Sequence, residues 1–346
     1  MKIDANSVTF EPQDMAFVKK FGILKATEMA LDYHAEHPNL PFLYDAEQLA
    51  GFLGISRGEL NDIVNHIQKE YKEAHLPKKD GTYRSLCVPS IRLRFCQDPI
   101  KEKILPQLPV SKFATAYQKG STTRGNAEPH IGKKFLLKLD ITDFFGSITF
   151  EQVQRTAFNT RYVSRQVGYL LTSLCCKDDS LPQGAATSPA LSNIVMYRFD
   201  DYIGRWCSQR QIAYTRYCDD MTFSANRPLY GVYQKVKTML REMGFELNES
   251  KTHFIGNDNR QSVTGLVVNE KLSIPSGYKR DLRQEVYYAL KFGVEDSVLH
   301  GHRSDFVEDG RPICCPTYML HLMGKVQYVL QIEPENLWFK DAQKKL

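Results

Sequence analysis

The fold of this chain is decided by residues 212–224, which read Ile-Ala-Tyr-Thr-Arg-Tyr-Cys-Asp-Asp-Met-Thr-Phe-Ser. Aromatic and β-branched residues, the types enriched in strands, lie on both sides of the central Tyr217-Cys218-Asp219-Asp220. We therefore predict two strands joined by a tight turn. The turn would hold the carboxylates of Asp219 and Asp220 next to each other.

A third carboxylate, Asp140, follows another strand-like run at residues 135–139. Because side chains alternate along a strand, its two faces differ. A helix-covered apolar face would comprise Phe135, Leu137 and Leu139, and an open working face would comprise Leu136, Lys138 and Asp140. The later strand alternates in the same way, and pairing the two strands would bring Asp140 close to Asp219.

Carboxylates crowded together repel one another unless a cation neutralises them. Oxygen-only ligand sets suit Mg²⁺, and paired Mg²⁺ ions are the usual device for in-line displacement at phosphorus. The sequence therefore predicts a metal-dependent nucleotidyl transferase with Asp140, Asp219 and Asp220 as its catalytic residues. The competing interpretation is that these three are only capping carboxylates.

The composition is that of a soluble globular protein, with 346 residues, 42% of them hydrophobic and 25% charged. A net charge of +5 is a mild bias toward polyanionic partners. No apolar run approaches the roughly 20 residues of a membrane span, and the first residues lack the apolar stretch of a signal peptide. The eight cysteines show no zinc-ligand spacing, so we expect free thiols in a reducing cytoplasm.

Several local signals precede the first catalytic strand. Asp45 and Ser56 each begin a capping-box pattern, which predicts two short helices around Gly54. These helices could form a helix-turn-helix that binds duplex DNA, or a helical subdomain that packs on the rest of the protein. Asp80-Gly81 lies between two extended stretches and predicts a β-hairpin that carries positive charge.

Further signals follow the first catalytic strand. Ser188 would be the N-cap, and Pro189 the first residue, of a helix that covers the sheet. A second helix is expected at 232–243, where Gly244 stops it. We expect strands around 246–248 and 263–268, and a helix at 278–292.

These motifs resemble those of the reverse transcriptases, from about residue 76 to about residue 290. The resemblance depends on an ordered set: the basic hairpin with Arg84, residues 139–145 (Leu-Asp-Ile-Thr-Asp-Phe-Phe), residues 181–189 with Leu-Pro-Gln-Gly and Ser-Pro, the Tyr-Cys-Asp-Asp turn, residues 244–251 and residues 263–266. Residues 126–130 (Asn-Ala-Glu-Pro-His) and 263–265 (Val-Thr-Gly) are similar to two signatures of bacterial retron reverse transcriptases.

The resemblance implies an α+β fold of the right-hand polymerase type. It has fingers, a palm whose antiparallel sheet is covered by helices, and a helical thumb. We expect an N-terminal extension at 1–44 and fingers at 45–134, with 150–180 inserted. The palm would comprise 135–149 and 181–268, and the thumb and C-terminal helices 269–346.

The resemblance also implies an RNA-directed DNA polymerase that copies part of its own non-coding RNA. Synthesis would start from the 2′-hydroxyl of a guanosine and yield branched multicopy single-stranded DNA (msDNA). The implied partners are that RNA and its msDNA, dNTPs, an accessory effector protein in anti-phage defence and host RNase H, with no membrane involved. Two alternatives stay open: a defence polymerase of another lineage, and a scaffold that holds RNA–DNA to restrain an effector.

The resemblance further assigns residues to metal and nucleotide. Two Mg²⁺ ions, or Mn²⁺ as a substitute, would be held by Asp140, Asp219, Asp220 and the backbone carbonyl of Ile141. The nucleotide-binding residues would be Lys78, Arg84, Phe145, Gln183 and Lys251, with the two basic hairpin residues on the triphosphate. Phe145 is either a sugar gate that excludes a 2′-hydroxyl or simply core, and Lys251 is either near the nucleotide or a solvated surface lysine.

RNA or DNA would be bound by Asn126, His130, Tyr217, Val263, Thr264, Gly265, Lys279, Arg280 and Arg283, many of which offer hydrogen-bonding groups or positive charge. The alternatives are a packed histidine for His130 and a solvated charged face for the thumb cations. The chain departs from the family pattern at Cys218, where many retron enzymes have alanine. Cysteine is small enough that we expect activity to survive.

Overall fold

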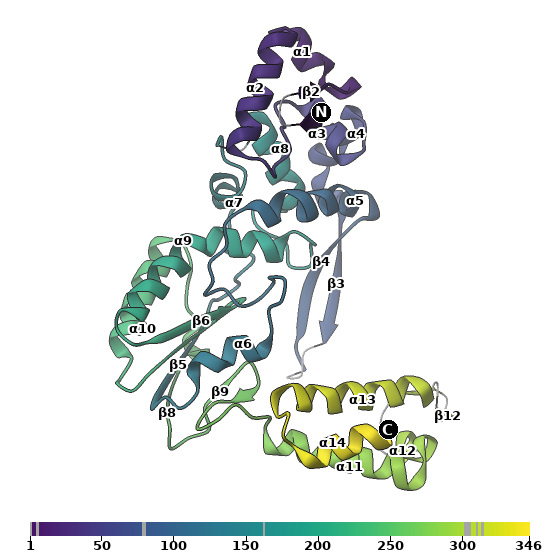
Figure 1. Ribbon diagram of the computed structural model, residues 1–346, viewed down its shortest axis with the longest axis vertical. Helices are drawn as coiled ribbons and strands as arrows, with labels where there is room; N and C mark the ends of the chain where they lie inside the picture. The colour runs from purple at the N-terminus through teal and green to yellow at the C-terminus, as the bar shows by residue number, and fades with distance from the viewer. Residues whose placement is uncertain are drawn as a thin grey trace.

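A computed structural model describes residues 2–4, 7–77, 81–161, 163–300, 306–308, 311–312 and 315–346. The predicted nucleotide-binding Lys78 lies outside these residues. Figure 1 shows the N-terminal helices at one end of the molecule, a central sheet, and a helical unit that contains the C-terminus at the other end. The architecture is α+β, as predicted.

The central sheet is antiparallel and has the strand order β6-β7-β5-β8. These strands span Ala213–Tyr217, Asp220–Ala225, Phe135–Asp140 and His253–Gly256. The prediction of a strand at 246–248 was wrong, because Leu247 makes only an isolated bridge to Ile141, and β8 is the edge strand instead. Residues after Asn248 first form a 3-10 turn, η6 (Glu249–Lys251), before the chain becomes extended.

One face of the sheet is covered by α9 (Ser188–Ser208) and α10 (Tyr230–Glu242), as Figure 1 shows. Tyr214 of β6 and Phe223 of β7 stack there at 4.6 Å between ring centroids. The helix α9 begins at Ser188, so Ser188 is not its N-cap. Its hydroxyl instead donates to the carbonyl of Pro182 at 2.7 Å, which joins the helix to the preceding loop.

The other face of the sheet is only partly open, which corrects the sequence-based expectation. It is covered by α6 (Thr123–Ala127), the 3-10 turn η5 (Glu128–His130) and a small hairpin, β9 (Ser262–Val263) with β10 (Leu266–Val267). Leu136, expected on the open face, is 1% exposed and belongs to the second hydrophobic core. The open part of this face is therefore confined to the end of β5 that carries Asp140.

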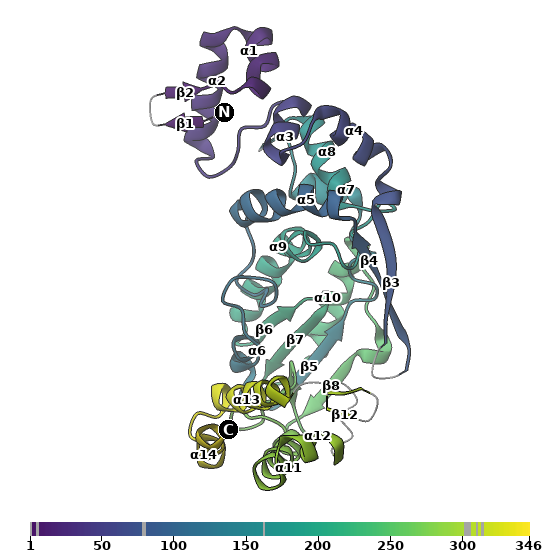
Figure 2. The ribbon, with the colours of Figure 1, turned by 90° about the vertical axis from the view of Figure 1, so that its right-hand side faces the viewer.

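The region before β5 consists of helices and a long two-stranded ribbon, which extends away from α5 in Figures 1 and 2. The elements are α3 (Ala46–Leu53), α4 (Arg57–Asn65), η2 (Ile67–Glu70), β3 (Tyr71–Pro77), β4 (Tyr83–Pro89), α5 (Ile91–Pro99), η3 (Ile100–Ile104) and η4 (Leu105–Gln107). Both predicted capping residues, Asp45 and Ser56, accept the expected backbone hydrogen bonds. The β3–β4 hairpin confirms the prediction from Asp80-Gly81.

The α3–α4 pair forms part of the main hydrophobic core. Both helices contact α8 (Arg165–Cys175), which follows α7 (Phe150–Thr156) in the chain. Leu60 and Ile63 of α4 are fully buried in this core. The packing favours the helical-subdomain interpretation over a free helix-turn-helix.

The first residues form a separate small group of elements. They are β1 (Lys2–Asp4), β2 (Ser7–Thr9), η1 (Pro12–Asp14), α1 (Met15–Phe21) and α2 (Ile23–Glu36). Gly22, with φ +78°, separates the two helices. An aromatic cluster around Phe17, with Phe21, Phe42 and Tyr44, ties this group to the chain that leads into α3.

The C-terminal unit packs around the second hydrophobic core, which it shares with Leu136 of β5 and with the β9–β10 hairpin. It contains α11 (Ser276–Phe292), α12 (Val294–His300), β11 (Val307–Glu308), β12 (Arg311–Pro312), α13 (Cys315–Ile332) and α14 (Leu337–Lys345). Among the described residues, no helix is long and apolar enough to cross a membrane.

Candidate active site

The Tyr-Cys-Asp-Asp turn joins β6 to β7 by two residues. Tyr217 pairs directly with Asp220, so Cys218 and Asp219 form the connection. Cys218 has φ +61°, the left-handed conformation that two-residue hairpin loops require. The predicted strand-turn-strand is confirmed, and it presents a partly exposed Asp219 and an exposed Asp220 at the tip.

Asp140 meets this turn across the sheet. In the register of β5 and β7, Asp140 lies directly opposite Asp220. The backbone N–H of Ile141 donates to the carbonyl of Asp219 at 3.2 Å, which fixes the end of β5 against the turn. Three carboxylates that are distant along the chain therefore converge at one end of the sheet, as the strand pattern predicted.

Lys251 is paired with Asp140. Its ammonium group lies 3.1 and 2.9 Å from the two carboxylate oxygens, and this hydrogen bonding is the main cause that raises the pKa of Lys251. The turn η6 places Lys251 there, because the backbone N–H of Asn248 donates to the carbonyl of Asp140. Lys251 is therefore part of the carboxylate cluster and not an unattached surface lysine.

The carboxylates are electrostatically unbalanced. The pKa of Asp220 is raised, first by loss of hydration and next by the neighbouring Asp219 carboxylate. Within the described ranges, no three His, Cys, Asp or Glu side chains form a closed metal-binding group. Mg²⁺ needs no such group, since it is usually held by one or two carboxylates together with substrate phosphates and water. The donor set at the turn fits a hard divalent cation of that kind.

A buried ion pair lies directly behind the turn. Arg216 of β6 and Asp200 of α9 are both fully buried, and the guanidinium makes two hydrogen bonds to the carboxylate through Nη2 at 2.5 Å and Nε at 2.9 Å. Its Nη1 donates to the carbonyl of Cys218 at 2.8 Å. Tyr214 donates to the same carboxylate at 2.7 Å, and Asn193 accepts from the guanidinium at 3.1 Å.

This network positions the backbone of the turn, and sequence reasoning missed it. Arg216 could have drawn attention because an arginine in an otherwise apolar strand face needs a buried partner. Its partner Asp200 gives no local signal, since it is one of two adjacent aspartates in a helix.

Tyr117 also contacts the Tyr-Cys-Asp-Asp turn. Its hydroxyl donates to the Sγ of Cys218 at 3.0 Å, and the residue itself has φ +61°. Nearly half of the Tyr117 side chain, 48%, is exposed. The contact gives Cys218, the departure from the family pattern, a specific partner.

The predicted nucleotide-binding residues on β4 and in the 181–189 loop are linked by backbone. The N–H of Cys87 donates to the carbonyl of Gln183 at 2.7 Å, three residues beyond the exposed Arg84. Gly184 has φ +120°, and a Cβ there would lie 2.9 Å from the Cys87 carbonyl, so only glycine permits this close approach. Phe145 is 9% exposed and packs on Phe144 at 5.5 Å between ring centroids.

Asn126 and His130 are buried inside the protein, which corrects their assignment as direct RNA contacts. His130 is 0% exposed, and its ring nitrogens bond the hydroxyls of Ser224 (2.7 Å) and Thr215 (2.9 Å) on neighbouring strands. Burial lowers the pKa of His130 to about 3, so the ring is neutral. The alternative of a packed histidine is the correct one.

Asn126 joins the two retron-like motifs. It is 2% exposed, and its Nδ2 donates to the Thr264 hydroxyl at 3.3 Å. Thr264 and Gly265 connect β9 to β10 with φ +45° and +83°, the pattern of a type I′ turn. Gly265 is exposed and Thr264 partly so, whereas Val263 is fully buried and cannot reach a nucleic acid directly.

Two of the three cations that were predicted to bind nucleic acid make side-chain contacts within the C-terminal unit. Lys279 pairs with Glu333 at 2.7 Å, with both side chains largely buried. The Arg283 guanidinium lies over the rings of Trp338 and Phe339, 5.6 and 5.4 Å from their centroids. Arg280 is 81% exposed, beside Asp281 at 3.5 Å. Arg280 and Arg283 are both exposed, so these two, and not Lys279, present their charge to solvent.

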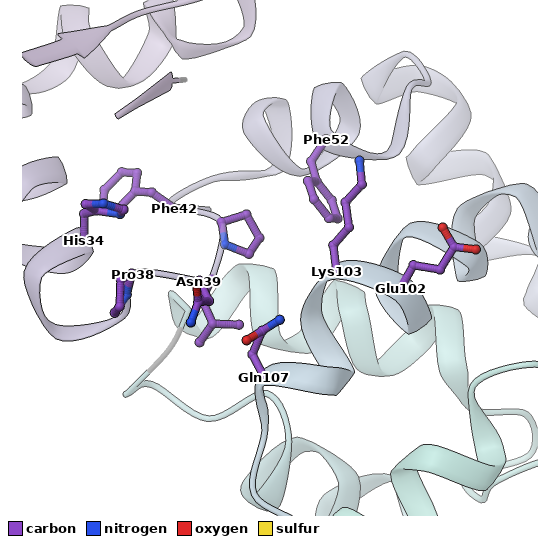
Figure 3. Close-up of a pocket in the computed structure, with 10 residues that line it drawn as sticks. His34, Pro38, Asn39, Phe42, Phe52, Glu102, Lys103 and Gln107 are labelled. Atoms are coloured by element: carbon purple, nitrogen blue, oxygen red, sulfur yellow. The ribbon is translucent and has the colours of Figure 1, made fainter. Parts of the chain in front are cut away.

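A separate cavity of about 460 Å³ lies between the N-terminal group and the elements α3, η3 and η4. Figure 3 shows Phe42, Phe52 and Lys103 around it. Phe42 packs against Phe17 of the aromatic cluster, and Lys103 lies over the Phe52 ring at 5.6 Å. These side chains serve the junction itself, so the cavity adds nothing to the carboxylate site.

The family comparison agrees with the fold and the site. A family model described as reverse transcriptase (RNA-dependent DNA polymerase) matches residues 76–268, more than half of the chain. This range contains the Tyr-Cys-Asp-Asp turn, strand β5 and the loop at 181–189. The chain is therefore a reverse transcriptase, an RNA-directed DNA polymerase.

Comparison with individual relatives shows which group of reverse transcriptases the chain belongs to. Retron Mx65 reverse transcriptase of Myxococcus xanthus is 31% identical over 321 residues, 86% of this chain and 70% of that protein. Retron Ec83 and Ec86 reverse transcriptases of Escherichia coli are 34% and 28% identical, and cover 63% and 77% of this chain and 75% and 84% of their own lengths. The chain belongs to the retron reverse transcriptases.

A solved structure of apo telomerase from Candida tropicalis is also similar to this chain, with a TM-score of 0.46 and 12% sequence identity. The match covers 84% of this chain and 63% of that one. A likeness at this level does not bear on function, and the family assignment depends on the sequence relatives alone.

Proposed function

We propose that this enzyme copies part of its own non-coding RNA into branched msDNA, primed from a guanosine 2′-hydroxyl. It would act in the bacterial cytoplasm as part of an anti-phage system with an accessory effector protein. The observation that carries this proposal is the hydrogen bond from Asn126 to Thr264, which joins the two retron-like motifs. The joined motifs place the partly exposed Thr264-Gly265 turn on the same face of the sheet as Asp140.

The carboxylates would hold the metal ions of the reaction. When bound, two Mg²⁺ ions would lower the pKa of the attacking hydroxyl and neutralise the triphosphate and the leaving pyrophosphate. Asp140, Asp219, Asp220 and the Ile141 carbonyl are the proposed ligands, and Lys251 supplies a positive charge beside them. We expect EDTA to abolish DNA synthesis, and added Mg²⁺, or less effectively Mn²⁺, to restore it.

The β3–β4 ribbon would bind the incoming dNTP. Arg84 projects from β4 into solvent and suits a triphosphate, and Lys78 is the second proposed clamp. The backbone hydrogen bond from Cys87 to Gln183 fixes the ribbon relative to the 181–189 loop. We expect this loop to lie near the sugar and base of the nucleotide.

Phe145 would exclude the 2′-hydroxyl of a ribonucleotide. A Phe145→Ala variant should therefore incorporate ribonucleotides at least about tenfold better relative to dNTPs, because one lost steric contact of this size changes discrimination by 1–3 kcal/mol. The measurement is primer extension with each nucleotide class. Phe144→Ala is the matched control, since Phe144 is core (4% exposed) and its loss should lower stability without changing sugar selection. Unchanged selection in Phe145→Ala would remove the gate assignment.

The proposed contacts to RNA or DNA among the residues named from the sequence remain Tyr217, Thr264, Gly265, Arg280 and Arg283. Each is at least partly exposed. Asn126, His130 and Val263 support these contacts from within the protein.

The decisive experiment expresses the protein together with its native flanking DNA. Nucleic acid that copurifies with the enzyme should contain a DNA whose 5′ end is released from RNA by a 2′–5′ debranching enzyme. The double variant Asp219→Ala/Asp220→Ala should yield none and should also lose phage protection. If unrelated RNAs prime DNA synthesis equally well, the msDNA proposal fails although the polymerase assignment stands.

A further inference from the structure

The outward face of α9 and α10 is hollowed. Two adjoining cavities of about 590 and 580 Å³ lie there and share Tyr202. The α9 residues that line them, which include Arg198, Tyr202 and Trp206, recur every three or four positions and therefore form one helical stripe. Half of the Tyr202 side chain, 50%, is exposed.

Cations on this face are held against aromatic rings. The ammonium of Lys235 lies 5.0 Å from the centroid of Tyr202 and 5.3 Å from that of Trp206, and it donates to the Tyr202 hydroxyl at 3.1 Å. The guanidinium of Arg210 lies 4.5 Å from the Trp206 centroid. We call Arg198, Tyr202, Trp206, Arg210 and Lys235 the palm-back patch.

The cations of the palm-back patch outnumber the carboxylates that line the same two cavities, which are Asp201 and Glu242. Among the ion pairs of the described residues, none involves Arg198, Arg210 or Lys235, whereas the nearby Arg205 is paired with Asp201. The unpaired cations of the palm-back patch differ from Lys279 in the proposed thumb, which is paired with Glu333. Ring faces attract these cations without cancelling their charge, so they can still bind anions.

The palm-back patch lies on the opposite side of the sheet from the carboxylates. Asp200 on the inner face of α9 reaches Arg216 of β6, so the stripe with Tyr202 points away from the sheet. Side-chain alternation along β5 puts Leu139 in the core under these helices and Asp140 on the other face. A nucleic acid on the palm-back patch would therefore not occupy the catalytic site.

We propose that the palm-back patch binds a single-stranded segment of RNA outside the copied region, an inference that rests on the proposed function that the enzyme carries its own RNA. Exposed aromatic rings with interleaved, uncompensated cations are the combination that binds single strands, through base stacking and phosphate contacts. Tyr202 would stack a base, and Lys235, Arg210 and Arg198 would bind the flanking phosphates. An apolar protein partner would instead require an uncharged centre, which this face lacks.

Intrinsic fluorescence can test this binding, because Trp206 and Trp338 are the two tryptophans of the chain. A Trp338→Phe variant leaves Trp206 as the reporter. The enzyme is first saturated with an RNA–DNA primer–template hybrid to occupy the catalytic face, and single-stranded oligoadenylate is then added. We expect a saturable change in Trp206 emission. An unchanged emission, or an equal change with inorganic polyphosphate, which has charge but no bases, would overturn the proposal.

Variants sharpen the test with the same hybrid-saturated enzyme and fluorescein-labelled oligoadenylate. Tyr202→Ala should weaken binding about tenfold, whereas Tyr202→Phe, which keeps the ring, should not. Lys235→Ala should reduce the slope of log binding affinity against log salt concentration by about one, the amount expected for one lost phosphate contact. Lys237→Ala is the matched control on the same helix, because Lys237 is already paired with Glu249 at 2.6 Å. Equal effects of Lys235→Ala and Lys237→Ala would refute the palm-back patch.

Branched DNA from cells is scored for the same variants. If the unaltered enzyme makes msDNA but Tyr202→Ala does not weaken RNA binding, the palm-back patch proposal fails and the proposed function stands. Absence of msDNA from the unaltered enzyme, with oligoadenylate bound at the palm-back patch, would overturn the proposed function alone.

Discussion

The front and the back of the catalytic turn differ in how their charges are balanced. In front, Asp140 is ion-paired with Lys251, and the pKa of Asp220 is raised despite the nearby charges of Lys138 and Lys251. Behind, Arg216 and Asp200 form a fully buried pair with every charged group hydrogen-bonded. The carboxylates in front therefore keep unbalanced negative charge, whereas the ion pair behind holds the backbone of the turn.

The largest effect is expected at the front. Asp219→Asn keeps the side-chain volume but removes a proposed metal ligand, so DNA synthesis should fall by at least about a thousandfold. The same change removes a like charge next to Asp220, so the melting temperature in EDTA should stay equal or rise. Primer extension and thermal melting measure the two effects. A variant that loses both activity and stability would show that Asp219 is a structural residue.

The next effect is expected at the back. Asp200→Asn leaves the Arg216 guanidinium buried without its counter-charge, which should cost about 3–5 kcal/mol in the free energy of unfolding. The adjacent Asp201→Asn is the control, because its partner Arg205 is 72% exposed and this solvent-screened pair should contribute less than about 1 kcal/mol. Urea denaturation gives both values. If both variants lose the same free energy of unfolding, the buried pair does not hold the turn more strongly than an exposed pair would.

The same contrast explains what the sequence could predict. The turn, the pairing of Asp140 with it and the β3–β4 hairpin depend on local patterns, namely alternation, turn residues and carboxylate spacing. Asp200, by contrast, has the same local pattern as Asp201, and only the packing of α9 on β6 decides which one is buried. Partners far along the chain likewise decided the burial of His130 and the pairing of Lys279 with Glu333, which is 54 residues away.

The edge strand β8 illustrates an error of the opposite kind, in which a predicted strand did not form. A strand was expected around residues 246–248, but the turn η6 follows there and brings Lys251 to Asp140. The edge strand therefore starts later, at His253. Tertiary hydrogen bonds thus overrode a weak local preference.

A smaller, pH-dependent effect is expected from His130. Its pKa is about 3 in the folded protein and about 6.5 in the unfolded chain, so the unfolded state binds the extra proton between these values. Stability should be fully present above pH 6.5 and decline as the pH falls, by on the order of 2 kcal/mol at pH 5. The comparison is with His130→Gln, which should be less stable at neutral pH but lack this part of the slope. Parallel pH profiles for the two proteins would contradict the burial of a neutral histidine.

The smallest effect is expected at the contact between Tyr117 and Cys218 on the front of the turn. A thiol is a weak acceptor, so Tyr117→Phe and Cys218→Ala should each cost less than about 1 kcal/mol in the free energy of unfolding. Because they remove the same hydrogen bond, the double variant should cost less than the sum. Activity should survive in all three, since the backbone of Cys218 is still held from behind by Arg216. A strong loss of DNA synthesis in Tyr117→Phe without a change in stability would show that this hydroxyl acts in the reaction, and that the turn depends on support from both sides.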